Sequence, residues 1–183
     1  MEFLIVTGLS GAGKSRALHA MEDIGFYCMD NIPPKLIPAV YDLCQQAQSL
    51  PRVAVVTDIR GGDMFSSLFE TLDEMQAAEK PYNILFLDAS DTVLRNRFQE
   101  TRRKHPLAED TTGLEQAVKL EREILRPVRE RADYLIDTSL LSPAQLKERI
   151  SGLFLGDASA GLQIYCMSFG FKFGIPPEAD LVF

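Results

Sequence analysis

The chain has 183 residues, of which 46% are hydrophobic, and this is enough for one medium-sized domain with a substantial core. Its net charge of -7 argues against non-specific binding of nucleic acid by the chain as a whole. Three widely spaced cysteines, Cys28, Cys44 and Cys166, fit neither a zinc site nor a disulfide framework, and no apolar run reaches membrane-spanning length, so we expect a cytoplasmic protein without a signal peptide or membrane partner.

The most informative motif follows a β-rich run at residues 3–6 and reads Gly8-Leu9-Ser10-Gly11-Ala12-Gly13-Lys14-Ser15. It matches the phosphate-binding pattern of Gly, four residues, Gly, Lys, and Ser or Thr. The glycines let backbone N–H groups approach an anion, Lys14 can reach the outer phosphates, and the Ser15 hydroxyl can hold Mg²⁺. A helical pattern at 16–24 follows, so the sequence predicts a nucleotide-binding loop rather than a glycine-rich turn that binds nothing.

Strands and helices continue to alternate after this loop. Apolar spacing predicts a strand at 26–29, a helix at 36–47, a strand at 53–57, a helix at 65–78 and a strand at 84–88. It then predicts a basic helix capped by Ser90 or Asp91, a helix at 114–130 disturbed near Pro127, a strand at 134–136 and a helix at 142–153 that opens with a capping box. Five short apolar strands alternating with helices predict an α/β domain over residues 1–155, with the five-stranded parallel sheet of a P-loop NTPase fold flanked by helices.

In such a sheet, ligands bind at the carboxyl ends of the strands. Two aspartates that end apolar strands, Asp58 and Asp88, are candidates for the carboxylate that helps Ser15 to hold Mg²⁺. We favour Asp58 because Arg60-Gly61-Gly62 leaves open backbone beside it, whereas Asp88 could instead cap the helix that follows it. The segment 137–139 after the last strand could read a base edge or form a turn and cap.

The basic helix carries four arginines, Arg95, Arg97, Arg102 and Arg103. They could form a lid that neutralises charge on the phosphates, a solvated basic face, or a contact surface for an RNA backbone. No aromatic residues are interleaved with them for base stacking. Neither His19 nor His105 has a companion serine or cysteine arrangement, so a catalytic triad is not expected.

The residues after 155 differ in composition from the rest of the chain. Small and polar residues at 156–161 indicate a linker. The apolar residues at 162–183 indicate the start of a second, truncated C-terminal domain, with a final hairpin on the sheet edge as the alternative.

Six motifs together resemble the RapZ/YvcJ family of bacterial nucleotide-binding proteins and RNase adapters: residues 8–15, 25–33, 58–60, 86–89, 101–107 and 168–172. The resemblance implies a P-loop fold close to the small-molecule kinases, with binding and weak hydrolysis of ATP and GTP. It places the ATP site at residues 8–15 and a GTP-contacting segment at Asp58, Ile59, Arg60 and Gly61. In one branch it also implies small regulatory RNAs and an endoribonuclease as partners in the control of amino-sugar synthesis. In that branch the resemblance places the RNA-binding elements in a C-terminal domain that continues beyond Phe183.

We therefore expect a nucleotide-binding regulatory module with weak ATPase and GTPase activity. In this interpretation Lys14, Asp58, Arg102 and Arg103 act on the phosphates, and Ser15 and Asp58 hold the metal. A homo-oligomer is compatible with the sequence.

Two other functions remain open. A small-molecule kinase would use Asp30 to orient an acceptor hydroxyl, with Arg60 and the arginine helix clamping the phosphates. A scaffold would keep the fold without turning nucleotide over, although the intact Lys14 and Ser15 favour binding.

Overall fold

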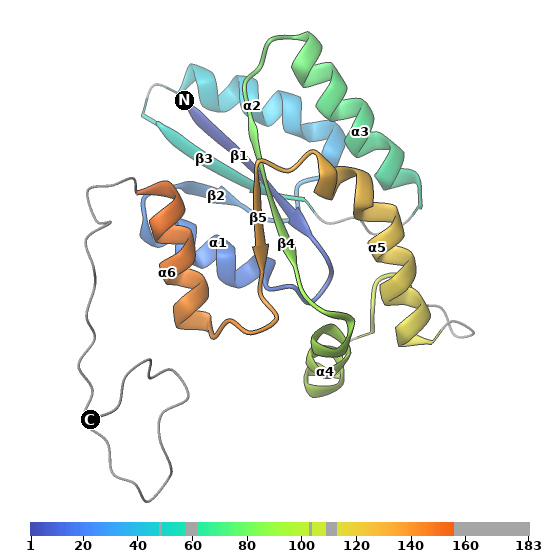
Figure 1. Ribbon diagram of the computed structural model, residues 1–183. Helices are drawn as coiled ribbons and strands as arrows, with labels where there is room; N and C mark the ends of the chain where they lie inside the picture. Colours follow the sequence, from blue (N-terminus) through green and yellow to red (C-terminus); the bar gives the residue numbers. More distant parts are fainter. Residues whose placement is uncertain (48, 58–61, 103, 109–112, 156–183) are drawn as a thin grey trace, which may run out of the picture.

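A computed structural model describes residues 1–47, 49–57, 62–102, 104–108 and 113–155. Five parallel strands form one sheet in the order β2-β3-β1-β4-β5, as the alternating pattern predicts (Figure 1). The strands are β1 Glu2–Gly8, β2 Tyr27–Met29, β3 Arg52–Val56, β4 Asn83–Asp88 and β5 Tyr134–Asp137. In the register, Ile5 of β1 pairs with Val55 of β3 on one side and with Ile84 of β4 on the other. The central strand β1 therefore has a paired strand along both edges.

Helices cover both faces of the sheet. They are α1 Lys14–Asp23, α2 Ile37–Gln46, α3 Gly62–Ala77, α4 Asp91–Thr101, α5 Leu114–Glu130 and α6 Pro143–Phe154, with a short 3₁₀ helix, η1 Pro34–Leu36, before α2. Right-handed crossovers place α1, which leads from β1 out to β2, on the face opposite to α2, α3 and α5. Helices α1 and α6 pack against each other on that first face (Figure 1). Both faces of the central strands are thus buried, which explains their continuous apolar runs.

The ends of the helices follow local sequence signals. Gly13 is the N-cap of α1, so this helix begins two residues before the predicted residue 16. Ser90 caps α4 by accepting a hydrogen bond from the Val93 N–H at 3.4 Å. The predicted capping box of α6 is confirmed, because Ser142 and Gln145 each accept the other's backbone N–H.

The cysteines of the described residues are free thiols. Cys44 is buried in the core. Cys28 is half-buried, and burial, followed by the charge of Glu22, raises the pKa of its thiol to about 12. Cys166 and the predicted linker and tail at 156–183 lie outside the described residues.

Candidate functional site

The loop at residues 8–15 leaves the central strand and runs directly into α1. Gly8 has a φ of 140°, and a Cβ atom at this position would lie only 2.1 Å from the carbonyl oxygen of Leu87 in β4. The Leu9 N–H donates to that same oxygen at 3.1 Å. Glycine at position 8 therefore lets the chain turn out of the sheet in close contact with the neighbouring strand.

The start of α1 faces the space in front of the loop. Its N-cap, Gly13, has a φ of 100° and no side chain caps the helix. An α-helix without a side-chain cap presents its first N–H groups and the positive end of its dipole to whatever lies before it. This arrangement is the general basis of anion binding at helix N-termini.

Lys14 is buried and its ammonium group lies over the loop. Lys14 Nζ donates to the carbonyl oxygens of Gly8 at 2.7 Å and Leu9 at 3.1 Å. The neighbouring Ser15 is exposed on the first turn of the same helix. The predicted phosphate-binding and metal-binding side chains of the loop therefore lie next to each other.

A cleft of about 890 Å³ opens in front of the loop. It is lined by loop residues 10–16, the carboxyl ends of β2 and β3, α4 and the segment after it, and the connection from β5 to α6. This volume is within the range of small-molecule sites. The described lining residues include four cationic side chains, Lys14, Arg16, Arg97 and Lys104, and two acidic ones, Asp30 and Glu100. The cleft is thus locally cationic although the chain as a whole carries a net charge of -7.

Arg97 joins three parts of the cleft wall. From α4 its guanidinium donates to the Gly11 carbonyl oxygen at 2.9 Å, and to the Thr138 hydroxyl and carbonyl oxygens at 3.0 and 2.8 Å. The buried Thr138 hydroxyl lies 2.9 Å from the Ala12 carbonyl oxygen and 3.1 Å from that of Asp88. Burial, and then the charge of Arg16, lower the pKa of Arg97 from its usual value, but a guanidinium remains protonated.

A buried carboxylate supports the loop from behind. Glu121 of α5 accepts the Ser10 N–H at Oε2 (3.0 Å) and the Ser10 hydroxyl at Oε1 (2.6 Å). His105 Nε2 lies 3.1 Å from Glu121 Oε2, and His105 Nδ1 accepts the Leu107 N–H at 3.1 Å. Burial raises the pKa of Glu121, but hydrogen bonds from His105 and Ser10 and the charge of Lys14 outweigh it and hold the pKa below its ordinary value. The carboxylate, rather than the imidazole, contacts the serine, so the group does not have the arrangement of a catalytic triad.

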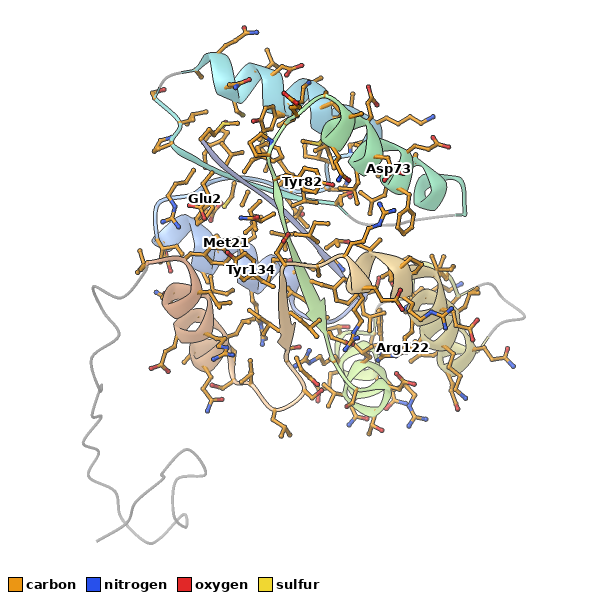
Figure 2. The ribbon with its side chains drawn as sticks, turned by 45° about the horizontal axis from the view of Figure 1, so that its top comes forward. Glu2, Met21, Asp73, Tyr82, Arg122 and Tyr134 are labelled. Carbon is orange, nitrogen blue, oxygen red and sulfur yellow. The ribbon has the colours of Figure 1, made fainter. Side chains whose placement is uncertain are left out.

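Asp88 has neither of the roles that the sequence left open for it. Its carboxylate accepts from Arg122 Nη1 at 2.8 Å, from Arg129 Nε at 2.9 Å and from the N–H of Ala89. Figure 2 shows Arg122 reaching from α5 toward α4. Because two guanidinium groups neutralise Asp88 and Ser90 caps α4, Asp88 is neither a helix cap nor a carboxylate open to a metal ion.

Some of the remaining predicted residues line the cleft and others do not. Asp30 and Asn31, after β2, line the cleft together with the loop. Arg102 is exposed, has a φ of 51° at the end of α4, and is not among the lining residues. Arg95 lies 3.7 Å from Glu115 of α5. Five residues with predicted roles lie outside the described part of the chain: Asp58, Ile59, Arg60, Gly61 and Arg103.

Residues 137–139 form a turn. Asp137 Oδ1 accepts the Ser139 N–H at 2.8 Å and the Ser139 hydroxyl, and these bonds lower the pKa of Asp137. Ser139 Oγ in turn accepts the Ser90 N–H at 2.8 Å. Of this segment, only Thr138 lines the cleft.

Sequence reasoning missed the roles of Glu121, His105 and Thr138. His105 lies inside the family motif at 101–107, and Thr138 lies inside the segment 137–139 at the end of the last strand. The sequence therefore singled out both positions but did not indicate which contacts they make. Glu121 is one of several glutamates in a long amphipathic helix, and its spacing does not distinguish it from the others.

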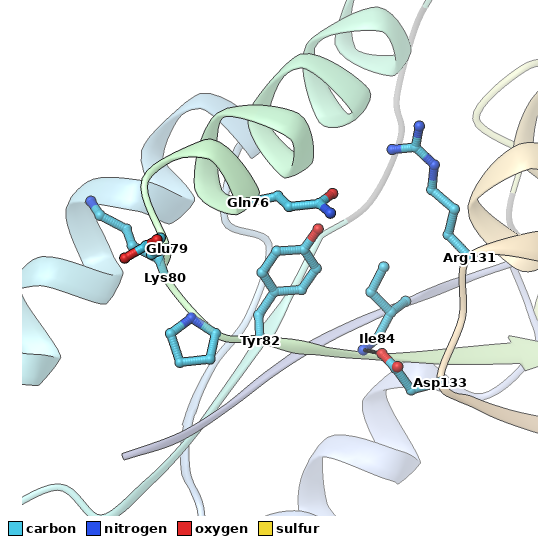
Figure 3. A pocket seen from close by; sticks show the side chains of 8 residues that line it. Gln76, Glu79, Lys80, Tyr82, Ile84, Arg131 and Asp133 are labelled. Atoms are coloured by element: carbon cyan, nitrogen blue, oxygen red, sulfur yellow. Dashed lines mark hydrogen bonds between the residues drawn. The ribbon is translucent and has the colours of Figure 1, made fainter.

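A second hollow lies at the opposite, amino-terminal end of the sheet (Figure 3). It has a volume of about 670 Å³ and is lined by residues of α3, the start of β4 and the segment before β5. Tyr82 donates to the Leu72 carbonyl oxygen at 3.2 Å, and Asp133 accepts the Ile84 N–H at 2.7 Å. No residue of the phosphate-binding loop at 8–15 lines this hollow, so the cleft at the carboxyl end is the candidate site.

The chain matches known proteins along most of its length. A model of the RapZ-like N-terminal domain matches residues 1–158. A nucleotide-binding protein of Caldanaerobacter subterraneus subsp. tengcongensis is 50% identical over 184 residues, which cover 100% of this chain and 64% of the relative. One from Alkaliphilus oremlandii is 51% identical and covers 100% of this chain and 63% of the relative. The chain therefore spans a little under two thirds of these relatives' length.

Solved structures show the same fold at low sequence identity. Shikimate kinase from Acinetobacter baumannii in complex with shikimate has a TM-score of 0.56 and 18% identity, covering 87% of this chain and 96% of that one. Shikimate kinase from Bacteroides thetaiotaomicron has a TM-score of 0.52 and 14% identity, covering 82% and 94%. In the described part of the chain, no helix combines the length and apolarity of a membrane span. The fold is that of the P-loop kinases, and the chain belongs to the family of RapZ-like N-terminal domains.

Proposed function

We propose that this chain is a nucleotide-binding module that holds ATP and GTP with Mg²⁺ at residues 8–15 and hydrolyses them slowly. The observation that carries the proposal is the glycine-rich loop at the end of the central strand, which opens into a cationic cleft before a helix start without a side-chain cap. The names of the relatives from Caldanaerobacter and Alkaliphilus support it, since both are nucleotide-binding proteins.

Each wall of the cleft has a role in this proposal. Lys14 would exchange its contacts with Gly8 and Leu9 for phosphate oxygens, with the first turn of α1 behind the phosphates. Mg²⁺ would supply charge neutralisation between phosphates, and Ser15, exposed beside Lys14, fits as its protein ligand. The base would lie toward Leu141 and Pro143, where the lining is apolar.

Among the described residues, the lining of the cleft offers few carboxylates that could hold a metal ion. The acidic residues among the described lining residues are Asp30 and Glu100, while Asp88 and Glu121 are already held by other groups. We propose Asp58 as the metal-side carboxylate, with Arg102 and Arg103 neutralising the phosphates. On this basis, Arg102→Ala with Arg103→Ala should slow hydrolysis more than it weakens binding. Equal losses would mean simple charge attraction.

The role of the longer protein is a separate part of the proposal. We propose a module at 1–155, a linker at 156–161 and the start of a C-terminal domain at 162–183, acting in the cytoplasm. The module's nucleotide state or assembly would then regulate delivery of small RNAs to an endoribonuclease by the full-length protein.

Calorimetric titration with non-hydrolysable ATP and GTP analogues and Mg²⁺ tests the nucleotide site. Lys14→Ala is expected to weaken binding by at least about tenfold, because a charge-assisted contact to phosphate is lost. The control is Lys147→Ala on α6, which removes an equal charge from an exposed ion pair with Asp23 of α1. No binding by the wild-type chain, or equal binding by the Lys14 variant, would contradict the proposal.

A small-molecule kinase is the second candidate because Asp30 lines the same cleft as the loop. Asp30 lies at the end of β2 and could orient an acceptor hydroxyl toward a nucleotide phosphate. Asp30→Asn should then abolish transfer to an acceptor while leaving hydrolysis by water unchanged. Equal loss of both activities would remove the acceptor role from Asp30.

A further inference from the structure

We infer that Glu121 is a positioning residue that fixes the two walls of the nucleotide cleft relative to each other, an inference that rests on the proposed function. One wall is the phosphate-binding loop, which Glu121 contacts at Ser10. The other is the segment after α4, which it contacts at His105. Glu121 is 3% exposed and is not among the residues that line the cleft, so it would act through these partners and not on the ligand.

The contact with the loop involves both backbone and side chain. Ser10 N–H and Oγ donate to different oxygens of the same carboxylate, at 3.0 and 2.6 Å. A two-point contact of this kind fixes the peptide plane as well as the side chain of Ser10. The position lies two residues after Gly8 and three before Gly13, in the middle of the turn that must receive the phosphates.

The contact with the other wall depends on which nitrogen of His105 carries the proton. Nδ1 accepts the Leu107 N–H, so the proton is on Nε2, which donates to Glu121 Oε2. His105 is thereby held at both ring nitrogens, and it lies between Lys104 and Pro106, two residues that line the cleft. The ring also packs on Phe98 of α4, with 5.0 Å between centroids.

The three hydrogen bonds converge on a single buried carboxylate. An ionised group at this depth requires several donors to offset its lost hydration, and Ser10 and His105 supply them. Removing the carboxylate would leave the donors of both walls without their common acceptor. The loop and the segment at 104–107 would then be free to move independently, and nucleotide binding would have to order them.

A glutamine at this position can reproduce the same contacts. Its amide oxygen in place of Oε2 would accept from Ser10 N–H and His105, and its NH₂ group in place of Oε1 would donate to Ser10 Oγ. Glu121→Gln therefore keeps the connection and removes only the charge, whereas Glu121→Ala removes both.

The test measures affinity for a non-hydrolysable ATP analogue with Mg²⁺, alongside the thermal midpoint of each variant. Glu121→Ala is expected to lose at least about tenfold in affinity and Glu121→Gln to stay within about threefold of wild type. The matched control is Asp133→Ala, which removes a carboxylate that also accepts a backbone N–H, at 2.7 Å from Ile84, at the far end of the sheet (Figure 3). It should lower the thermal midpoint without changing affinity.

Two further variants identify the route of the effect. Ser10→Ala should weaken binding in the wild-type background and add nothing to Glu121→Ala. Full additivity would overturn the inference, as would Glu121→Ala affinity within about twofold of wild type or an equal loss in Asp133→Ala. If Glu121→Ala does not fold, His105→Ala provides the test, because it leaves the contact between Glu121 and Ser10 in place. It should reduce nucleotide affinity and the contribution of Lys104 to that affinity. Unchanged affinity would overturn the inference. Absence of nucleotide binding by the wild-type chain would instead contradict the proposed function itself.

Discussion

The two ends of the sheet each have an arginine that connects separate segments of the chain, but the two arginines have different partners. At the amino end, Arg52 donates to the Glu2 carboxylate at 2.8 Å and to the carbonyl oxygens of Ile24 and Phe154, and lies 4.0 Å from the Phe26 ring centroid. At the carboxyl end, the described groups that accept from Arg97 are all neutral oxygens, of Gly11 and Thr138. The charge of Arg52 is neutralised by a carboxylate that it contacts directly, whereas no carboxylate among the described groups accepts a hydrogen bond from Arg97.

This difference shows how one fold separates stability from binding. Polar groups at the amino end satisfy one another, as Asp133 does with Ile84 and Lys80 with Asp42. At the carboxyl end, α1 begins without a side-chain cap, and the described lining of the cleft has more cationic than acidic side chains. An anionic ligand would neutralise this positive charge. Substitutions at the two ends should therefore affect different measurements.

The largest effect is expected from Gly8→Ala. The added methyl group would lie 2.1 Å from the Leu87 carbonyl oxygen, with Gly8 at a φ of 140°, so β1 and β4 must separate at the site. We expect a loss of about 3 kcal/mol or more in the free energy of unfolding, measured by denaturant titration. The control is Gly152→Ala in α6, where an added Cβ would meet no atom from another part of the described chain within 4 Å, and it should stabilise the protein by about 1 kcal/mol. Equal stability of the two variants would contradict the close contact at Gly8.

The paired arginines test the comparison directly. Arg52→Ala should lower the free energy of unfolding by about 2 kcal/mol and leave nucleotide affinity unchanged. Arg97→Ala should lower affinity by about tenfold and stability by only about 1 kcal/mol. Denaturation and calorimetry on both variants provide the measurements. If Arg52→Ala weakened nucleotide binding as much as Arg97→Ala, the two ends would not be functionally distinct.

A smaller effect is expected from the pH dependence of Glu121. A carboxyl group whose pKa is lower in the folded than in the unfolded chain stabilises the fold above its unfolded pKa, and this contribution is lost as pH falls through the folded pKa. Because the pKa of Glu121 is lowered from 4.5, wild type should exceed Glu121→Gln in stability near neutral pH, and the difference should shrink as the solution is acidified below 4.5. Denaturation of both proteins across this range is the measurement, and a difference independent of pH would mean that the charge contributes nothing.

The smallest effect is expected from single lysines. Lys104→Ala should lower nucleotide affinity by about threefold, and this loss should fade as salt is added, because exposed charges are screened. Lys80→Ala, which breaks the pair with Asp42 at 2.8 Å at the amino end, should leave affinity unchanged at every salt concentration. Titrations at low and high salt separate these outcomes.

Local spacing in the sequence was sufficient to predict the helices and strands of the fold and the phosphate-binding loop at 8–15. The strand at 84–88 was evident as an uninterrupted apolar run, and the start of α6 as a capping box, because both signals lie within a few consecutive residues. The order of the strands was not predicted, since periodicity does not indicate which strands are neighbours. Asp88 was ambiguous for the same reason: its partners Arg122 and Arg129 come from a helix more than thirty residues away.

The contacts that hold the phosphate-binding loop in place were the part of the structure least predictable from the sequence. Ser10 and Glu121 are 111 residues apart, and their contact depends on how α5 packs behind the loop. A glutamate on an amphipathic helix is normally solvated, and only the tertiary structure distinguishes a buried one. Thr138 and Arg97 likewise become part of the cleft only when α4 and the β5–α6 connection meet the loop.

The start of α1 at Gly13 also has a thermodynamic consequence. Helix α1 begins without a side-chain cap, as α2 and α5 do, but it alone of these three starts at the phosphate-binding loop, so a phosphate group bound before it would serve as its cap. The ligand would then contribute to the folded state itself, and stability would rise with the logarithm of ligand concentration above the dissociation constant. For such a protein, the cellular level of nucleotide would also determine how much of the chain remains folded.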